Sequence, residues 1–176
     1  MAQLVVDALT KRFAAYKEMA EKAFGQIDDV KLHQPLDENT NSVAVIMKHM
    51  AGNLQSRFTD FLTSDGEKPG RDRDREFVED GRDRAAIVAD WEGGWKCLMD
   101  AIRALSDRDL ARTVLIRGDP HTVIDALLRQ LSHHAYHVGQ IVQVSRYLAK
   151  DNWKVITIPR GGSKTFNAAM DSKHKR

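Results

Sequence analysis

Apolar residues recur every three or four positions along four long segments of this 176-residue chain. Such spacing places the apolar side chains on one face of an α-helix, and no other property of the sequence restricts its fold as strongly. The segments span about residues 4–27, 43–62, 85–105 and 122–149. Because amphipathic helices cover one another's apolar faces, the sequence predicts an all-α protein built as an antiparallel-type four-helix bundle.

The connections between these segments differ in length and character. The run from Ser64 to Arg84 contains three glycines, one proline and nearly balanced charges, which predicts a solvated loop. A loop this long inside a compact domain is uncommon and is often a lid or a binding loop. The TVLI run at residues 113–116, followed by RGDP, is β-prone and predicts a short hairpin. Gly93 and Gly94 lie inside the third helix, where each costs about 1 kcal/mol relative to alanine, so a close helix neighbour or a kink is expected.

The C-terminal region departs from the helical spacing. Residues 153–163 read WKVITIPRGGS, a brief alternation followed by a turn, which predicts a short irregular or β-prone extension. The last residues end in DSKHKR and predict a basic, frayed tail. We therefore divide the chain into a bundle domain, residues 1–165, and a tail, residues 166–176.

Charge and composition argue against several classes of protein. The net charge is +2, from 27 Lys and Arg against 25 Asp and Glu, and the two signs are interleaved, which disfavours nucleic-acid binding. No apolar run approaches the ~20 residues of a membrane span, and the N-terminus lacks the order of a signal peptide. Cys97 is the single cysteine and is interpreted as a core thiol rather than a nucleophile, because no histidine lies nearby in sequence. These features predict a cytoplasmic protein that binds neither membrane nor nucleic acid.

Three histidines fall within five positions of the fourth segment, in the run LSHHAYHVGQI at residues 131–141. His133 and His137 are four residues apart, and His134 and His137 are three apart; either spacing places two rings one turn apart on one helix face. Two imidazoles in that arrangement are close enough to bind the same metal ion. Periodicity alone does not choose between the pairs, and helices can also present several histidines to solvent.

A third ligand is expected from a facing helix, and His49 in the run IMKHMAGN is the candidate. Asn53 and Arg57 follow at intervals of four residues, which forms a polar row beside the apolar stripe of the second helix. Such a row is costly to bury without partners, and a metal, its bound water and an anionic substrate would supply them. The alternative for His49 is an ordinary, partly exposed histidine. The remaining histidines, at positions 33, 121 and 174, are assigned no role.

The pattern HxxxHVGQI late in the chain, with a histidine midway along the second helix, resembles the DinB/YfiT-like superfamily of candidate metalloenzymes over nearly the whole chain. Residues 41–69, 73–77 and 156–163 are also similar to an uncharacterised bacterial branch, through NSVAVIMKHMAGNLQSRFTDFLTSDGEKP, RDREF and ITIPRGGS. The resemblance implies an up-down-down-up bundle whose crossover is the Ser64–Arg84 connection. It implies a divalent metal, zinc or nickel, held by His49, His133 and His137, with His134 outside the ligand set. It also implies a homodimer.

Three nitrogen ligands leave a coordination position open, as in catalytic zinc sites. The sequence contains no serine nucleophile elbow, phosphate-binding glycine loop or CxxC motif, so the metal is the expected source of chemistry. We therefore predict an enzyme that activates water or a low-molecular-weight thiol against an electrophilic small-molecule substrate.

Asn53, Arg57 and Gln140 are candidates to orient a ligand or bind substrate, although Arg57 could equally form a salt bridge to the acidic loop. The IPRGGS turn is interpreted as structural, with an anion-binding turn as the alternative. A non-catalytic metal-stabilised bundle and a small-ligand-binding protein are the competing functions.

Overall fold

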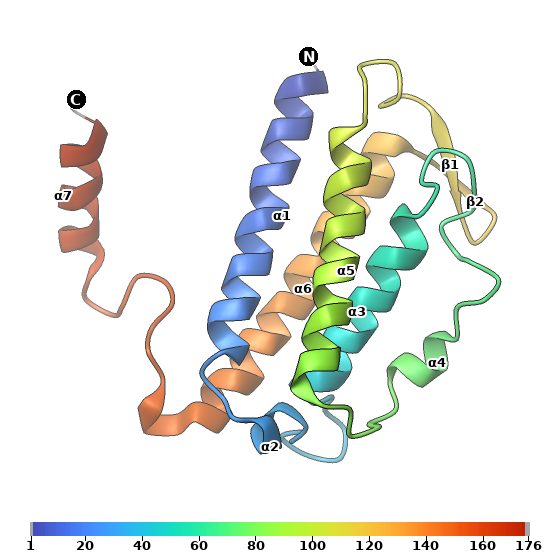
Figure 1. Ribbon diagram of the computed structural model, residues 1–176. Helices are drawn as coiled ribbons and strands as arrows, with labels where there is room; N and C mark the ends of the chain where they lie inside the picture. Colours follow the sequence, from blue (N-terminus) through green and yellow to red (C-terminus); the bar gives the residue numbers. More distant parts are fainter. Residues whose placement is uncertain (1, 175–176) are drawn as a thin grey trace.

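Four long helices form the body of the computed structural model, which describes residues 2–174 (Figure 1). They are α1 (Ala2–Phe24), α3 (Val43–Phe58), α5 (Arg84–Arg103) and α6 (Val123–Ala149). These helices match the four segments predicted from apolar spacing, which confirms the all-α bundle. Shorter elements lie between and after them: α2 (Asp29–Leu32), α4 (Arg73–Glu76), the 3₁₀ turn η1 (Lys150–Asn152) and α7 (Ser163–His174).

The direction of the helices gives the bundle its up-down-down-up path. In Figure 1, α1 and α6 run one way, whereas α3 and α5 run the other way. The parallel helices α3 and α5 pack against each other, as do α1 and α6. Because α3 and α5 are parallel neighbours, the chain must return along the whole bundle between them. The connection that contains α4 makes this return, which confirms the predicted crossover.

The core is apolar and centred on aromatic rings. Trp91 and Trp95 of α5 are fully buried with ring centroids 5.4 Å apart, and Phe13 of α1 meets Trp95 edge to face at 6.4 Å. Gly94 allows the close approach of α3 and α5, because a Cβ at this position would lie 3.0 Å from the Cα of Ala51. The expectation of a close helix neighbour is therefore met by Gly94 and not by Gly93, whose added Cβ would only reach a side-chain amide at 3.5 Å.

The helix boundaries follow from capping and from backbone turns. Ser42, Asp83 and Thr122 each accept a hydrogen bond from the backbone N–H three residues later, which caps the starts of α3, α5 and α6. Helix α3 ends at Phe58, four residues before the predicted end. Thr59 is extended and Asp60 takes a positive φ of 50°, so the chain turns away although Phe61 and Leu62 still pack against the core.

The predicted hairpin is present between α5 and α6. Strands β1 (Thr113–Ile116) and β2 (Asp119–Thr122) pair antiparallel around the two-residue turn Arg117–Gly118. Val114 and Ile116 are buried against the bundle. Hydrogen bonds from Gly66 N to Leu115 O (2.7 Å) and from the turn to Asp65 attach the hairpin to the crossover connection.

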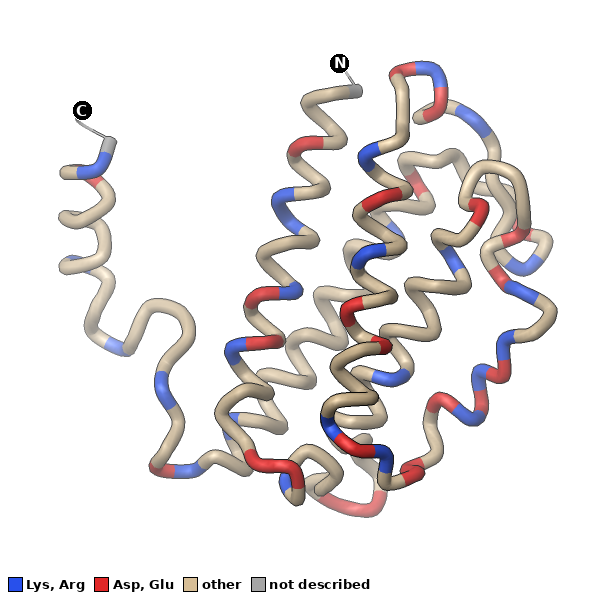
Figure 2. The backbone as a smooth tube through the Cα atoms, viewed as in Figure 1, with Lys and Arg blue, Asp and Glu red and all other residues tan. Residues whose placement is uncertain are grey.

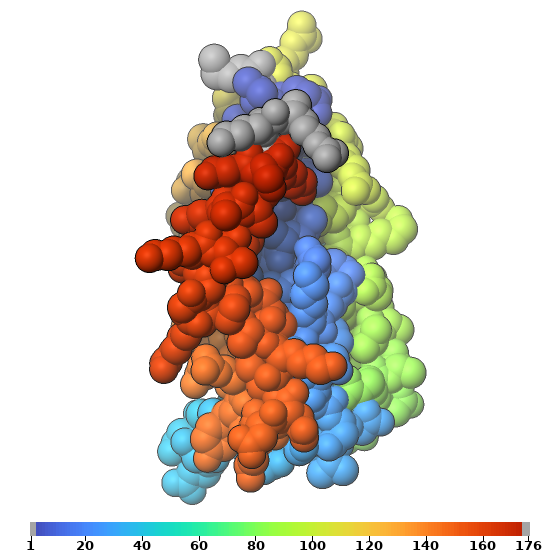
Figure 3. Space-filling model, turned by 90° about the vertical axis from the view of Figure 1, so that its left-hand side faces the viewer, coloured from blue at the N-terminus to red at the C-terminus, as the bar shows by residue number. Residues whose placement is uncertain are grey.

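The C-terminal segment differs in part from the prediction. Residues 153–162 contain no strand, and α7 begins at Ser163, so residues 166–174 are helical where a frayed tail was expected. The run SKTFNAAM contains good helix formers, and the N–H of Phe166 donates to Gly162 O at 3.0 Å. Helix α7 stands apart from α1 in Figure 1 and forms the outer layer of the face in Figure 3.

Charged side chains of both signs are spread along most elements. In Figure 2, Lys and Arg alternate with Asp and Glu along the helices and through the crossover connection. Within the described residues, no helix has the length and apolar character needed to cross a membrane.

Candidate metal centre

Three imidazole rings from two helices meet at the wall of a cavity. His49 lies on α3, and His133 and His137 lie one turn apart on α6. The Nε2 atom of His133 is 3.3 Å from Nε2 of His49 and 3.1 Å from Nε2 of His137. The three potential ligand atoms all lie within 4.8 Å of one another. The structure thus brings together the three histidines that the resemblance implied.

Hydrogen bonds at the far side of two rings set the direction of their lone pairs. Nδ1 of His49 donates to Oε2 of Glu76 (2.9 Å), and Nδ1 of His137 donates to Oε1 of Gln140 (2.8 Å). A neutral imidazole with its N–H on Nδ1 carries its lone pair on Nε2, and in both rings Nε2 is the nitrogen that faces the other histidines. Burial, together with the neighbouring histidines, lowers the pKa of His133 to about 3; burial is also the main cause that lowers the pKa of His137 to about 4. The rings of His133 and His137 are therefore neutral at pH 7.

Nε2 atoms that converge in this way share either a proton, as an N–H···N hydrogen bond, or a metal ion. Two nitrogens bound to one zinc ion at tetrahedral angles are about 3.3 Å apart, given Zn–N bonds of about 2.0–2.1 Å. The distances of 3.1 and 3.3 Å between the Nε2 atoms agree with that spacing. Imidazole nitrogens also suit nickel, copper and iron, so the donor set fits a divalent transition metal without selecting one.

Glu76, which the sequence analysis did not single out, orients His49. It lies at the end of α4 in the crossover connection, is buried, and receives two hydrogen bonds from Arg71, at 2.7 and 2.8 Å. Burial alone raises the pKa of Glu76, but hydrogen bonds from His49 and Arg71 outweigh it and hold the pKa below its ordinary value. The ionised carboxylate fixes the His49 tautomer, as carboxylates behind metal-binding histidines commonly do.

A glycine on α3 makes room for this carboxylate. A Cβ added at Gly52 would lie 2.9 Å from Cδ of Glu76 and closer still to its Oε1. Phe77, the next residue of the crossover, stacks on the His49 ring with centroids 4.5 Å apart. The RDREF run and the glycine three residues after His49 were visible in the sequence. The pairing of Gly52 with Glu76 was not visible, because Glu76 lies 24 positions later in the chain, beyond the end of α3.

His134 lies outside the cluster. Its ring is fully buried near Phe13 and Trp95, with centroid distances of 6.2 and 5.4 Å. Neither ring nitrogen has a hydrogen-bond partner within the described chain. Burial lowers the pKa of His134 well below its ordinary value, so the ring is a neutral part of the core.

The cavity beside the histidines has a volume of about 410 Å³, and all three predicted substrate or ligand-orienting residues line it. Gln140 holds the His137 ring and also donates through Nε2 to the Tyr136 hydroxyl (3.1 Å). Asn53 is buried beside the histidines. Arg57 forms the alternative salt bridge, to Glu67 of the crossover at 3.0 Å, while still lining the cavity.

Residues 1–162 match the model of a family described as a protein of unknown function, DUF1572. The chain belongs to the DUF1572 family. No curated protein matches it. Its fold is similar to that of YfiT from Bacillus subtilis, described as a probable metal-dependent hydrolase with an unusual four-helix bundle topology. That likeness has a TM-score of 0.66 at 17% identity, and it covers 81% of this chain and 87% of YfiT.

A DinB-like protein from Bacillus cereus is similar too, with a TM-score of 0.65 at 15% identity, over 85% of this chain and 96% of that protein. At these identities the likeness establishes the fold, which is the one that the DinB/YfiT resemblance implied. The DUF1572 match contains the three histidines, Gly52 and Glu76, and it ends just before α7.

Two other features of the DUF1572 chain lie away from the centre. Arg160 of the IPRGGS turn lines a separate hollow with Met19 and Trp153, so it does not reach the histidines. Cys97 is half-buried on α5, with its Sγ 3.6 Å from the Thr59 hydroxyl, and it does not line the histidine cavity.

Proposed function

We propose that this DUF1572 protein is a metal-dependent enzyme that hydrolyses an electrophilic small molecule. The observation that carries the proposal is the convergence of three Nε2 atoms, from His49, His133 and His137, at the wall of a cavity large enough for a small substrate. The description of YfiT as a probable metal-dependent hydrolase supports this choice.

The three imidazoles would hold a divalent metal, with zinc or nickel the expected ion. Such a cation acts as a Lewis acid that lowers the pKa of water toward 7 and polarises a carbonyl or phosphoryl oxygen. Glu76 and Gln140 keep the Nδ1 protons of His49 and His137 in place, so that both rings present Nε2 to the cavity. Asn53 is buried in the cavity wall with an unpartnered Oδ1, which can accept a hydrogen bond from water or substrate.

The proposal is tested by metal analysis of untagged protein, purified without chelator, together with hydrolysis of activated model esters and phosphoesters. We expect about one metal ion per chain and hydrolysis that is lost on chelation and restored by metal. His133→Ala should lose both metal and activity, whereas His33→Ala, whose ring contacts Glu79 away from the cavity, should keep both. Protein that contains no metal would overturn the proposal.

A parallel assay separates water from a thiol as the nucleophile. The same protein is incubated with a low-molecular-weight thiol and a model electrophile, and the thioether product is measured. Metal-dependent thioether formation without hydrolysis would replace the hydrolase proposal with a thiol transferase. Stoichiometric metal without either reaction would instead favour a non-catalytic binding protein.

A further inference from the structure

Five arginines line the cavity beside the three histidines, and they come from four separate parts of the fold. Arg57 lies on α3, Arg71 and Arg73 belong to the crossover connection, Arg117 is in the hairpin turn and Arg129 is on α6. No aspartate or glutamate lines the same cavity among the described residues. A cavity with this lining attracts anions.

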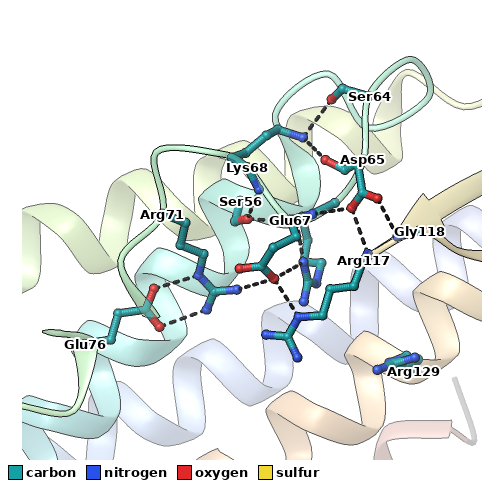
Figure 4. A network of polar contacts seen from close by, with 12 residues as sticks. Ser56, Ser64, Asp65, Glu67, Lys68, Arg71, Glu76, Arg117, Gly118 and Arg129 are labelled. Carbon is teal, nitrogen blue, oxygen red and sulfur yellow. Dashed lines mark hydrogen bonds and ion pairs between the residues drawn. The ribbon is translucent and has the colours of Figure 1, made fainter. Parts of the chain in front are cut away.

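The carboxylates behind these arginines are too few to neutralise them. Oε2 of Glu67 accepts from Arg117 at 3.0 Å and lies 3.4 Å from Arg71 (Figure 4). It also accepts from Arg57 at 3.0 Å. Glu76 takes the remaining hydrogen bonds of Arg71. With the 4.0 Å ion pair between Arg73 and Asp74 included, five guanidinium groups face three carboxylates, an excess of two positive charges.

Two of the five arginines have no strong carboxylate partner of their own. The nearest carboxylate to Arg73 is Asp74 at 4.0 Å, and the Arg73 guanidinium lies 4.9 Å above the Phe77 ring. Arg129 contacts Nε2 of His121 at 3.2 Å and forms no ion pair with any described residue. Both residues are exposed and line the cavity.

The position of Arg117 is set by the crossover connection. Arg117 and Gly118 take positive φ values of 57° and 75°, the conformation of a two-residue hairpin turn that favours asparagine or glycine at its first position. The Asp65 carboxylate accepts the backbone N–H of both residues, at 2.8 and 2.7 Å (Figure 4). An arginine is thus held where its backbone is strained, and its guanidinium lines the cavity while its Nε–H donates to Glu67 behind the wall.

Buried polar atoms of the cavity wall also lack partners within the described chain. They are Nε of Arg57, Oδ1 of Asn53 and Oε1 of Gln130, from side chains that are 6%, 6% and 4% exposed. All three residues line the cavity. Burial lowers the pKa of Arg57, and the nearby Arg71 and Arg117 act in the same direction. Buried polar atoms normally have partners, so these three indicate that polar groups belong here: the Nε–H of Arg57 can donate to an anion, whereas the two amide oxygens accept from water or from a donor group of the ligand.

We infer that the arginine-lined part of the cavity binds an anionic group of the substrate, a carboxylate or a phosphate, with Arg117 and Arg129 as its principal contacts. Guanidinium groups recognise both anions through paired N–H donors. The substrate is then a small anionic molecule whose electrophilic group faces the histidines. The role of the anion as part of a substrate rests on the proposed hydrolase function, whereas anion binding itself can be measured without turnover.

The test is calorimetric titration of chelator-treated protein with inorganic phosphate and, separately, with succinate at low ionic strength. We expect one site, weakened by added salt, whose affinity falls about tenfold or more in Arg117→Gln and in Arg129→Gln. Arg117→Lys should bind with intermediate affinity, because it keeps the charge and loses the paired donors. The control is Arg146→Gln, an exposed arginine of α6 outside this cavity, which should bind as the wild type does. Preference for phosphate or for succinate identifies the anion.

Equal affinity in the wild type and in both cavity variants, or no binding of either anion, would overturn the inference. Two further measurements separate its failure from failure of the proposed function. His133→Ala should lose metal and retain anion binding, and Arg129→Gln should retain metal and lose anion binding. Protein that binds the anion but no metal refutes the hydrolase alone, and protein that binds metal but no anion refutes this inference alone.

Discussion

Glu76 and His49 are joined by a 2.9 Å hydrogen bond between the crossover connection and α3. The contact links a local feature, the direction of one imidazole, to the least regular part of the fold. The carboxylate is also fixed from behind by Arg71, so neither partner is free to turn. The crossover is therefore a structural support of the candidate metal centre as well as the connection that the bundle topology requires.

Replacing Glu76 by glutamine should weaken metal binding and leave the fold intact. The variant removes the negative charge behind His49 while keeping the shape of the side chain, and loss of such a support typically costs 10–100-fold in metal affinity. The measurement is competition for metal with a chromogenic chelator. Glu79→Gln is the matched control, because Glu79 lies in the same connection and bonds the ring of His33 at 2.6 Å. Equal affinity in both variants would show that Glu76 does not act through His49.

A methyl group at Gly52 should also weaken metal binding, by displacing Glu76. The added Cβ would lie 2.9 Å from Cδ of Glu76, so the carboxylate must move. Gly93→Ala is the control: its Cβ meets nothing closer than 3.5 Å, and it should stabilise α5 by up to about 1 kcal/mol. Chelator competition and thermal unfolding are measured on both variants. Unchanged metal affinity in Gly52→Ala would mean that Glu76 keeps its place.

The bundle and the histidine cluster could be predicted because both depend on local spacing. A period of three to four residues places Trp91 and Trp95 on one face, and the same rule places His133 and His137 one turn apart. The choice of His133 rather than His134 did not follow from periodicity and came from the resemblance. In the structure, His134 is the ring that packs in the core, next to Trp95.

The remaining parts of the site could not be predicted, because they depend on contacts between distant segments. Nothing near Glu76 in sequence indicates that it will reach His49, 27 residues earlier. Arg117 approaches the cavity from the hairpin turn, whose backbone is attached to Asp65 of the crossover. The early end of α3 was not predicted either, because it depends on the turn at Asp60, from which the chain continues toward α4.

Metal removal should lower thermal stability without unfolding the protein. The aromatic core around Phe13, Trp91 and Trp95 is packed independently of the histidine cluster, so the bundle has its own source of stability. Bound metal at 100 times its dissociation constant adds about 2.7 kcal/mol, a loss that a domain of this size tolerates. Circular dichroism with and without chelator measures the effect. A protein that loses its helical signal on chelation at 25 °C would instead have a structural metal, as in the competing metal-stabilised bundle.

The metal-free protein should lose stability as the pH falls below about 6.5. Burial lowers the pKa of His134 well below its ordinary value in the folded state, and the pKa values of His133 and His137 fall to about 3 and about 4. The unfolded chain takes up protons at these histidines near pH 6.5, whereas the folded chain does not. The contribution of these rings to the free energy of unfolding is therefore fully present above pH 6.5. It is lost progressively toward pH 4, by up to about 1.4 kcal/mol per pH unit for each ring.

His134→Leu isolates the part of this pH dependence that comes from the core, because His134 lies outside the histidine cluster. Denaturant unfolding of chelator-treated protein between pH 4.5 and 7.5 gives the free energy of unfolding of each variant. Below pH 6.5, the slope of that free energy against pH should be smaller in His134→Leu than in the wild type by roughly 1.4 kcal/mol per pH unit. This difference corresponds to the uptake of one proton fewer on unfolding. An unchanged slope would mean that His134 takes up its proton in the folded state, which is incompatible with a ring buried near Phe13 and Trp95 without a hydrogen-bond partner.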